Sequence, residues 1–195
     1  MKKYSSILIA LACLAMIISF FVPLWTVTLD APQYPEGLTL QIWLSKLSGD
    51  VDIISELNHY IGMKKISVEM FPEFGYMSTI VIAVIVAGLI TAIVRKKWLF
   101  IIWFVAFFAI AAIGIYDFWS WEYDYGHNLD PRAAIKIADQ YYQPPLIGCK
   151  QLLNFNACSF PAGGGWVIII SGTISFLVFA YEMFFNRKKS RINLI

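Results

Sequence analysis

The chain has 195 residues, of which 59% are hydrophobic and 14% are charged, and its formal net charge is +2. Ordinary soluble domains hold roughly 45–50% apolar and about 25% charged residues, so the composition excludes a typical soluble globular protein. The 3 cysteines are too few for a disulfide-rich scaffold, and they lack the paired spacing of a zinc site.

Four apolar stretches approach or exceed the roughly 20 residues that a helix needs to cross a bilayer. The first also resembles a signal peptide, but its apolar run is longer than a signal h-region of about 7–15 residues, which favours a retained helix. We therefore predict an all-α membrane protein, a single membrane domain over 1–195, whose outer loops form a small cap of short helices and one short strand. The predicted spans cover 7–25, 77–94, 98–119 and 166–185, and the long loops cover 26–76 and 120–165.

Basic residues mark one side of the predicted membrane. Nine of them flank the spans there, at Lys2 and Lys3, at Arg95–Lys97, and at four positions within Arg187–Arg191. The positive-inside rule makes that side cytoplasmic. Both termini are then cytoplasmic, and both long loops face the periplasm of a bacterial inner membrane. Glu182, which we expect near Arg187 and Lys188, is the one carboxylate that does not lie in or beside those loops.

The spans themselves carry little chemistry. None has an Asp, Glu, Lys, Arg or His at mid-depth. Ion and proton pathways normally need such groups, so secondary transport is disfavoured. Ala83, Ala87 and Thr91 repeat at four-residue spacing, which indicates close helix packing rather than a transport path.

The first loop is predicted to be ordered. Apolar residues alternate over 38–44, which is typical of a strand, and the segment 31–37 before it reads as an extended stretch that closes in a turn. Asp50 is a favourable N-cap for a short helix, and Gly62 is a favourable stop. The inward residues of this helix are expected to be Ile53, Ile54, Leu57, Tyr60 and Ile61.

The second loop contains a second helix start and two cysteines. Asp130 is a predicted N-cap and Pro131 fits the first helical position, so a helix is expected from Arg132 to about Asp139. Outside the cytoplasm Cys149 and Cys158 would form a disulfide worth about 2–4 kcal/mol. The alternative is that Cys149 is a soft metal ligand. Cys13 lies in a span and is expected to be inert.

Both histidines lie in the outer loops, and methionine follows one of them. Imidazole and thioether ligands together suit copper(I), and carboxylates could support the histidines or bind a harder ion. The alternative is local hydrogen bonding, because two histidines without H-x-x-H or M-x-x-M spacing make no motif. The candidate metal ligands are His59, Met63, His127, Asp124, Asp130 and Glu56.

Four strings carry a resemblance to a known family. Ala31–Leu38 and Leu57–Met63 in the first loop, with Tyr125–Pro131 and Gln143–Gly148 in the second, resemble a small four-span membrane protein family encoded with nitrous oxide reductase maturation and copper-delivering lipoproteins. The resemblance covers both loops and the four-span frame, and it implies a pathway in denitrification rather than an assigned activity. That family has a histidine where this chain has Cys149. Either Cys149 replaces a ligand or the position was never one.

We therefore expect a membrane accessory protein that acts outside the cytoplasm in copper enzyme maturation. It would bind copper(I) or a copper-carrying partner, such as a lipoprotein or maturation factor. One alternative is a structural anchor or partner-binding subunit without metal. A second is a membrane enzyme or quinone-binding protein that uses His127 and neighbouring carboxylates, although no nucleophile or catalytic motif is evident. Membrane lipid and a protein partner are expected, and nucleic acid is not.

Overall fold

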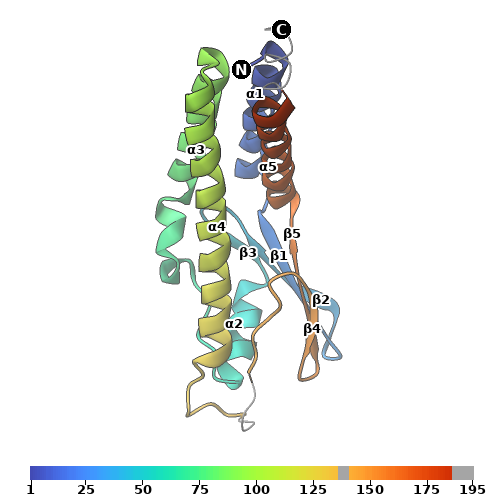
Figure 1. Ribbon diagram of the computed structural model, residues 1–195. Coiled ribbons are helices and arrows are strands. Elements are labelled where there is room, and N and C mark those ends of the chain that lie inside the picture. The colour runs from blue at the N-terminus through green and yellow to red at the C-terminus, as the bar shows by residue number, and fades with distance from the viewer. Residues whose placement is uncertain (136–140, 186–195) are drawn as a thin grey trace, which may run out of the picture.

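The computed structural model describes residues 1–135 and 141–185 and has two parts, a bundle of helices and a cap (Figure 1). The cap comprises residues 25–76, 120–135 and 141–161 and is built around a five-stranded antiparallel sheet of order β3-β2-β1-β5-β4. The strands are β1 (Trp25–Ala31), β2 (Tyr34–Ile42), β3 (Leu47–Gly49), β4 (Gly148–Leu152) and β5 (Phe155–Pro161). The helices are α1 (Lys3–Ala15), α2 (Val51–Tyr60), α3 (Met77–Val94), α4 (Lys97–His127) and α5 (Gly163–Ala180). Shorter turns of helix cover Met16–Phe20, Val68–Met70, Pro72–Gly75 and Tyr181–Phe185.

The bundle makes the chain a membrane protein of the four-span kind that the sequence predicts. Helices long and apolar enough to cross a membrane cover Lys3–Phe20, Met77–Val94, Lys97–His127 and Gly163–Phe184. The first ends at Phe20 rather than at Trp25, which begins β1. Pro23 has no backbone N–H with which to continue a helix. After it, the side chains of Trp25 and Val27 are buried and that of Thr26 between them is only partly buried, as in a strand.

The prediction of an all-α fold class is wrong, because the cap is centred on a sheet. β1 is its middle strand and pairs with β2 on one side and with β5 on the other. The pairing of Val27 with Ser159 joins segments from opposite ends of the chain. Val27 and Trp25 are buried on the inner face of the sheet. β1 follows a transmembrane helix directly, so its short alternation merges with the apolar run and gives little separate signal.

The predictions for the first loop are confirmed in part. The alternation over 38–44 corresponds to the second half of β2, with Leu38 and Leu40 buried. The predicted helix is α2, and Gly62 follows it with a φ of +85°. Asp50 occupies the N-cap position, but its carboxylate accepts the backbone N–H of Thr39 at 2.8 Å instead of capping α2. Two of the predicted inward side chains, Ile53 and Tyr60, are exposed.

The helix expected at Arg132 does not form over 132–135, and 136–140 lie outside the described residues. The Asp130 carboxylate accepts the N–H of Arg132 at 2.8 Å, and the Asp130 carbonyl accepts that of Ala133 at 3.1 Å, which closes a turn. The N–H of Ile135 then donates to the carbonyl of Tyr60, outside any helix of its own segment. Docking on α2 therefore takes precedence over the local helix signal.

The helix α4 extends well beyond the predicted end at 119. It has 31 residues, whereas a bilayer crossing needs about 20, so its last turns lie in the cap. Phe100, Trp103 and Phe107 belong to the core of the bundle. Trp121 and Tyr125 belong to the core of the cap, together with Val27 and Leu38 from the sheet and Ile54 from α2. One helix thus crosses both parts of the molecule.

The end of the bundle opposite the cap is closed by Glu182. Its carboxylate accepts the backbone N–H of Lys2 at 2.8 Å and the hydroxyl of Ser5 at 2.6 Å. Its backbone carbonyl accepts the ammonium of Lys97 at 2.8 Å. This one buried residue therefore ties the starts of α1 and α4 to the end of α5. Arg187 and Lys188, its expected neighbours, lie outside the described residues.

Gly88 allows α1, α3 and α4 to approach closely, which gives a first prediction. A Cβ at Gly88 would overlap Cys13 Sγ and lie 2.9 Å from the indole of Trp103. That indole cannot retreat freely, because its N–H donates to the carbonyl of Val84 at 2.9 Å. We expect Gly88→Ala to lower the free energy of unfolding by about 1–3 kcal/mol, measured by thermal unfolding in detergent.

Gly114→Ala is the matched control, because nothing lies within 4 Å of a Cβ at that position in α4. The extra helix propensity of alanine should leave its stability unchanged or raise it by up to about 1 kcal/mol. Equal melting temperatures for both variants would contradict the packing role of Gly88.

Candidate functional site

Five aromatic side chains form a continuous row along α4 and onto the neighbouring loop. We call this row the aromatic ladder. The ring centroids are 6.0 Å apart from Tyr116 to Trp119 and 5.5 Å from Trp119 to Tyr123. They are 3.9 Å apart from Tyr123 to His127 and 4.3 Å from His127 to Tyr141. The residues of α4 recur at three or four positions, so they share one face of the helix.

The ladder is exposed, although its members are large rings. Tyr116 is 67% exposed, Trp119 41%, Tyr123 47% and Tyr141 58%, whereas His127 is half-buried between its two neighbours. The opposite face of the same helix carries Trp121 and Tyr125 into the core of the cap. A contiguous exposed row of aromatic rings outside the lipid is a candidate interaction surface.

A membrane interface accounts for the lower part of the ladder only. Trp and Tyr favour the headgroup level, so Tyr116 and Trp119 are interface residues in the ordinary sense. His127 lies eight residues beyond Trp119, about 12 Å along the helix. The headgroup region on one side of a bilayer is only about 5–8 Å thick. The upper rungs, from Tyr123 to Tyr141, therefore project past the lipid and need another explanation.

His127 is held in place by stacking and by one hydrogen bond. Its ring stacks on both tyrosines with interplanar angles of 17° and 28°. Its Nδ1 lies 2.9 Å from the carbonyl oxygen of Tyr123, so Nδ1 carries the proton in that hydrogen bond. Nε2 is then the imidazole nitrogen with a lone pair, available to a ligand or a partner. The geometry supplies a fixed, oriented imidazole.

The carboxylates near His127 are engaged elsewhere. Asp124 accepts Lys64 at 2.5 Å and the Asn128 amide, and these bonds lower the pKa of its carboxyl. Asp130 pairs with Arg132 at 3.1 Å, which lowers the pKa of its carboxyl too. Among the described residues, neither hydrogen-bonds to His127. The expected acid–base arrangement of His127 with Asp124 or Asp130 therefore has no geometric support.

The candidate copper ligands are not gathered at one point. Met63 is buried in the core of the cap, whereas His59 and Glu56 are exposed on α2. His59 is close enough to Asp130 to influence the titration of its carboxyl. Within 1–135 and 141–185 no three His, Cys, Asp or Glu residues are placed to hold a metal ion. The copper site therefore stays a prediction from sequence.

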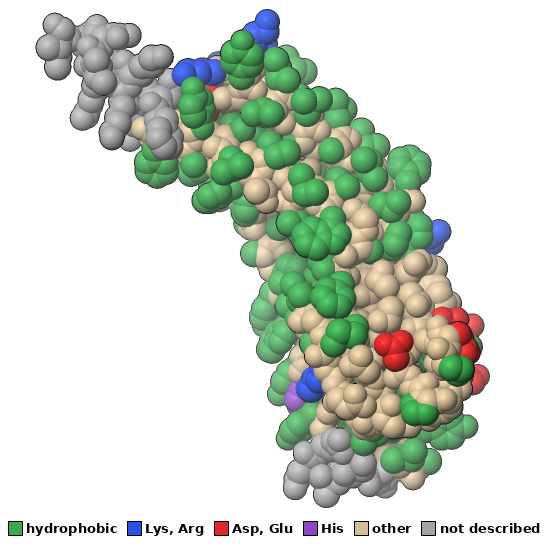
Figure 2. Space-filling model, turned by 90° about the vertical axis from the view of Figure 1, so that its right-hand side faces the viewer, with side chains coloured by type: hydrophobic (Ala, Val, Ile, Leu, Met, Phe, Trp, Pro, Cys, Tyr) green, Lys and Arg blue, Asp and Glu red, His purple; other side chains and the backbone are tan. Residues whose placement is uncertain are grey.

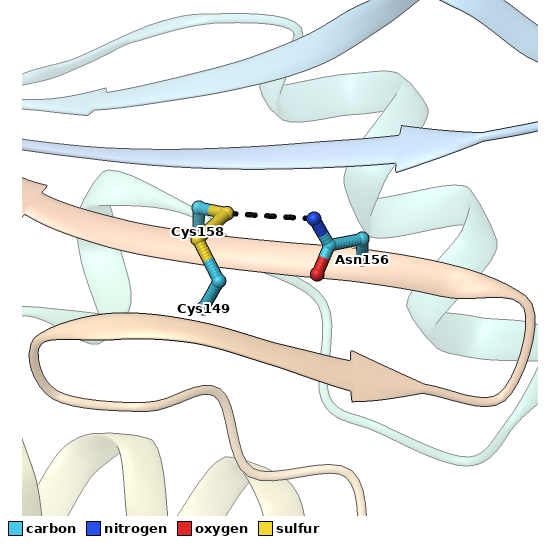
Figure 3. Close-up of a disulfide and its surroundings, with 3 residues drawn as sticks. All are labelled: Cys149, Asn156 and Cys158. Atoms are coloured by element: carbon cyan, nitrogen blue, oxygen red, sulfur yellow. Dashed lines mark hydrogen bonds between the residues drawn. A yellow bond between two sulfur atoms is a disulfide. The ribbon is translucent and has the colours of Figure 1, made fainter.

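Cys149 and Cys158 form a disulfide across the β4–β5 hairpin (Figure 3). They face each other in the register of the two strands, and the side-chain amide of Asn156 lies 3.6 Å from Cys158 Sγ. The disulfide predicted from sequence is thus present, and it leaves no thiolate at Cys149 to bind metal. The disulfide links the edge strand β4 to β5, which pairs with the central strand β1.

Glu122, an outer-loop carboxylate that the sequence offers as a possible support for a histidine, is buried on the inner face of α4. It is 1% exposed, and neither of its carboxylate oxygens has a hydrogen-bond partner among the described residues. The carbonyl of Gly126, one turn later, accepts the N–H of Tyr142 at 3.0 Å. The Tyr142 hydroxyl is likewise buried, with no partner in the described part of the chain. Burial raises the pKa of the Glu122 carboxyl to about 7. Its neutral form is therefore the one that suits the folded cap.

This burial predicts how stability depends on pH. The pKa of Glu122 rises from 4.5 to about 7 on folding, so the unfolded chain releases the proton first. Stability should be highest below about pH 4.5 and should fall as the pH rises to about 7, by about 3 kcal/mol in all. Glu122→Gln should remove this component from the melting temperature measured between pH 5 and 8.

Glu36→Gln removes an exposed carboxyl from the β1–β2 hairpin and serves as the control. It should keep the pH dependence of the native protein. The explanation fails if the melting curves of Glu122→Gln and the native protein shift with pH by the same amount.

Comparisons with family models, with curated proteins and with solved structures give no match to this chain. No function can therefore be transferred to this chain from a relative. What the molecule does has to follow from the chemistry of its exposed surfaces. The aromatic ladder is the most developed of these.

Proposed function

We propose that this protein is a membrane accessory protein that docks a copper-carrying protein partner outside the cytoplasm, in the maturation of a copper enzyme of the nitrous oxide reductase type. The observation that carries the proposal is the aromatic ladder, exposed from the membrane edge to the tip of α4. Tyrosine and tryptophan are enriched at protein interfaces and dominate their binding energy. The copper pathway is supported by the resemblance of the loop strings.

The sidedness of the proposal rests on charge and on the disulfide. Lys2, Lys3 and the three basic residues at Arg95–Lys97 lie at the end of the bundle far from the cap. Acidic side chains gather at the cap end of the face seen in Figure 2. By the positive-inside rule this distribution supports a cap outside the cytoplasm, where a disulfide persists.

Labelling with a membrane-impermeant maleimide tests this sidedness. In a Cys13→Ala background, intact cells treated with a mild reductant should become labelled at Cys149 and Cys158, and cells without reductant should not. Labelling that requires lysis of the inner membrane would place the cap in the cytoplasm and end the proposal.

The location of the ladder suits a partner that is itself tied to the membrane. Tyr123 and His127 stand about 12 Å or less above Trp119, within reach of a lipoprotein whose acyl chains hold it at the same surface. Tethering raises the effective concentration of such a partner at the ladder. A modest contact area of aromatic rings can then support transient docking and release, which a delivery step requires.

Co-purification with the copper-delivering lipoprotein tests the docking surface. Tyr123→Ala and Tyr141→Ala should each weaken its binding by about 30-fold, the loss expected for a hot-spot side chain. Tyr60→Ala is the matched control, because Tyr60 is 55% exposed on α2 but outside the ladder. Equal binding by all three variants would contradict docking at the ladder.

Copper(I) titration of the purified protein separates delivery by the partner from direct binding. If the partner carries the metal, the native protein should bind copper(I) no more tightly than micromolar while still docking the lipoprotein. Tighter binding that His127→Ala abolishes and His59→Ala preserves would instead assign the metal to the oriented imidazole at the top of the ladder.

A further inference from the structure

Two adjoining hollows run along the seam between α1 and α5 on the outer surface of the bundle. Their volumes are about 450 and 370 Å³, and both are lined by Leu8 and Ile174, so they form one continuous groove. The groove begins at Lys2 and Tyr181 and continues to Ala15 and Val167. Hydrophobic side chains cover the bundle on the face turned toward the viewer in Figure 2. Between its two ends the groove is almost wholly apolar.

The mouth of the groove carries a positive charge. The ammonium of Lys2 donates to the hydroxyl of Tyr181 at 2.7 Å and lies 4.9 Å from the centre of its ring. It makes no salt bridge within the described part of the chain. The buried carboxylate of Glu182 receives the backbone N–H of Lys2 and the hydroxyl of Ser5. The lysine side chain is thereby placed at the rim, with its charge toward the surface.

The length of the groove matches one leaflet of a bilayer. From Lys2 to Ala15 the helix rises by about 20 Å. Half of a hydrocarbon core of about 30 Å, together with one headgroup region of about 5 Å, gives the same length. An apolar groove of this depth with a cation at its polar end is complementary to a phospholipid with an anionic headgroup.

The direct packing of α1 on α5 favours an acyl chain over another helix in the groove. α1 and α5 are already joined behind the groove, where the hydroxyl of Ser171 donates to the carbonyl of Ala12 at 3.0 Å. A helix needs about 8–10 Å between its axis and each neighbour, whereas a single acyl chain fits into a seam between two packed helices. This hydrogen bond satisfies both polar groups at the bottom of the groove, and the rest of the bottom is lined by apolar side chains.

We propose that the α1–α5 groove binds one anionic phospholipid in the leaflet away from the cap, with an acyl chain along the groove and the headgroup phosphate at Lys2. This binding is independent of docking at the aromatic ladder. Its effect would be to fix α1 against α5 at the end of the bundle that Glu182 closes.

Native mass spectrometry of the detergent-purified full chain tests the proposal with two added lipids, phosphatidylglycerol and phosphatidylcholine. One phosphatidylglycerol should remain bound under conditions that remove phosphatidylcholine. Lys2→Gln should weaken phosphatidylglycerol binding by about fivefold, the contribution of one lysine near a lipid surface. Lys3→Gln removes the same charge from the adjacent position, outside the groove, and should leave binding unchanged.

A second pair of variants tests the apolar part of the groove. Leu8→Trp fills it and should reduce retention of the lipid, whereas Ile7→Trp adds the same bulk to α1 at a residue outside the lining. Equal retention of both lipids, or equal losses in Lys2→Gln and Lys3→Gln, would overturn the proposal. So would a dimer cross-linked through Leu8→Cys in a Cys13→Ala background, because a second copy would then occupy the groove.

Discussion

The continuity of α4 is the constraint on which the rest of the structure depends. A helix satisfies its own backbone hydrogen bonds in lipid and in water alike, so it can leave the membrane without a break. Its first half contributes Trp103 and Phe107 to the bundle core, and its last turns contribute Trp121 and Tyr125 to the cap core. The sheet is therefore packed on an extension of a transmembrane helix. The position of the cap relative to the membrane follows from this packing.

The sequence predicted the parts of the fold that have a strong local signal. The four apolar helices, the alternation in β2 and the position of α2 all leave such a signal, as a long apolar run or as a periodic pattern. β1 and β5 leave no such signal. β1 continues an apolar run, and β5 is a segment of only seven residues between turn-forming residues. Their pairing joins Val27 to Ser159, far apart in the chain. Such contacts depend on the tertiary fold, and no window of sequence contains them.

The site was predictable only where covalent or local chemistry defined it. Cys149 and Cys158 share one short loop, so their disulfide followed from spacing and compartment. The aromatic ladder did not, since Trp119 was interpreted as the last residue of its span. Helical spacing from Tyr116 to His127 could have revealed it if the helix had been extended, but Tyr141 joins through tertiary packing. The burial of Glu122 gave no signal, because a carboxylate near a loop is ordinarily exposed.

Rigid presentation gives the ladder its value as a binding surface. Association costs the freedom of the side chains and loops that become ordered, and a surface that is already ordered avoids part of that cost. Tyr123 stands on a helix, and His127 is clamped between two rings. A partner confined to the same membrane would meet this surface at a nearly constant height. A small contact surface of exposed aromatic rings can then bind the partner specifically and still release it, as repeated delivery requires.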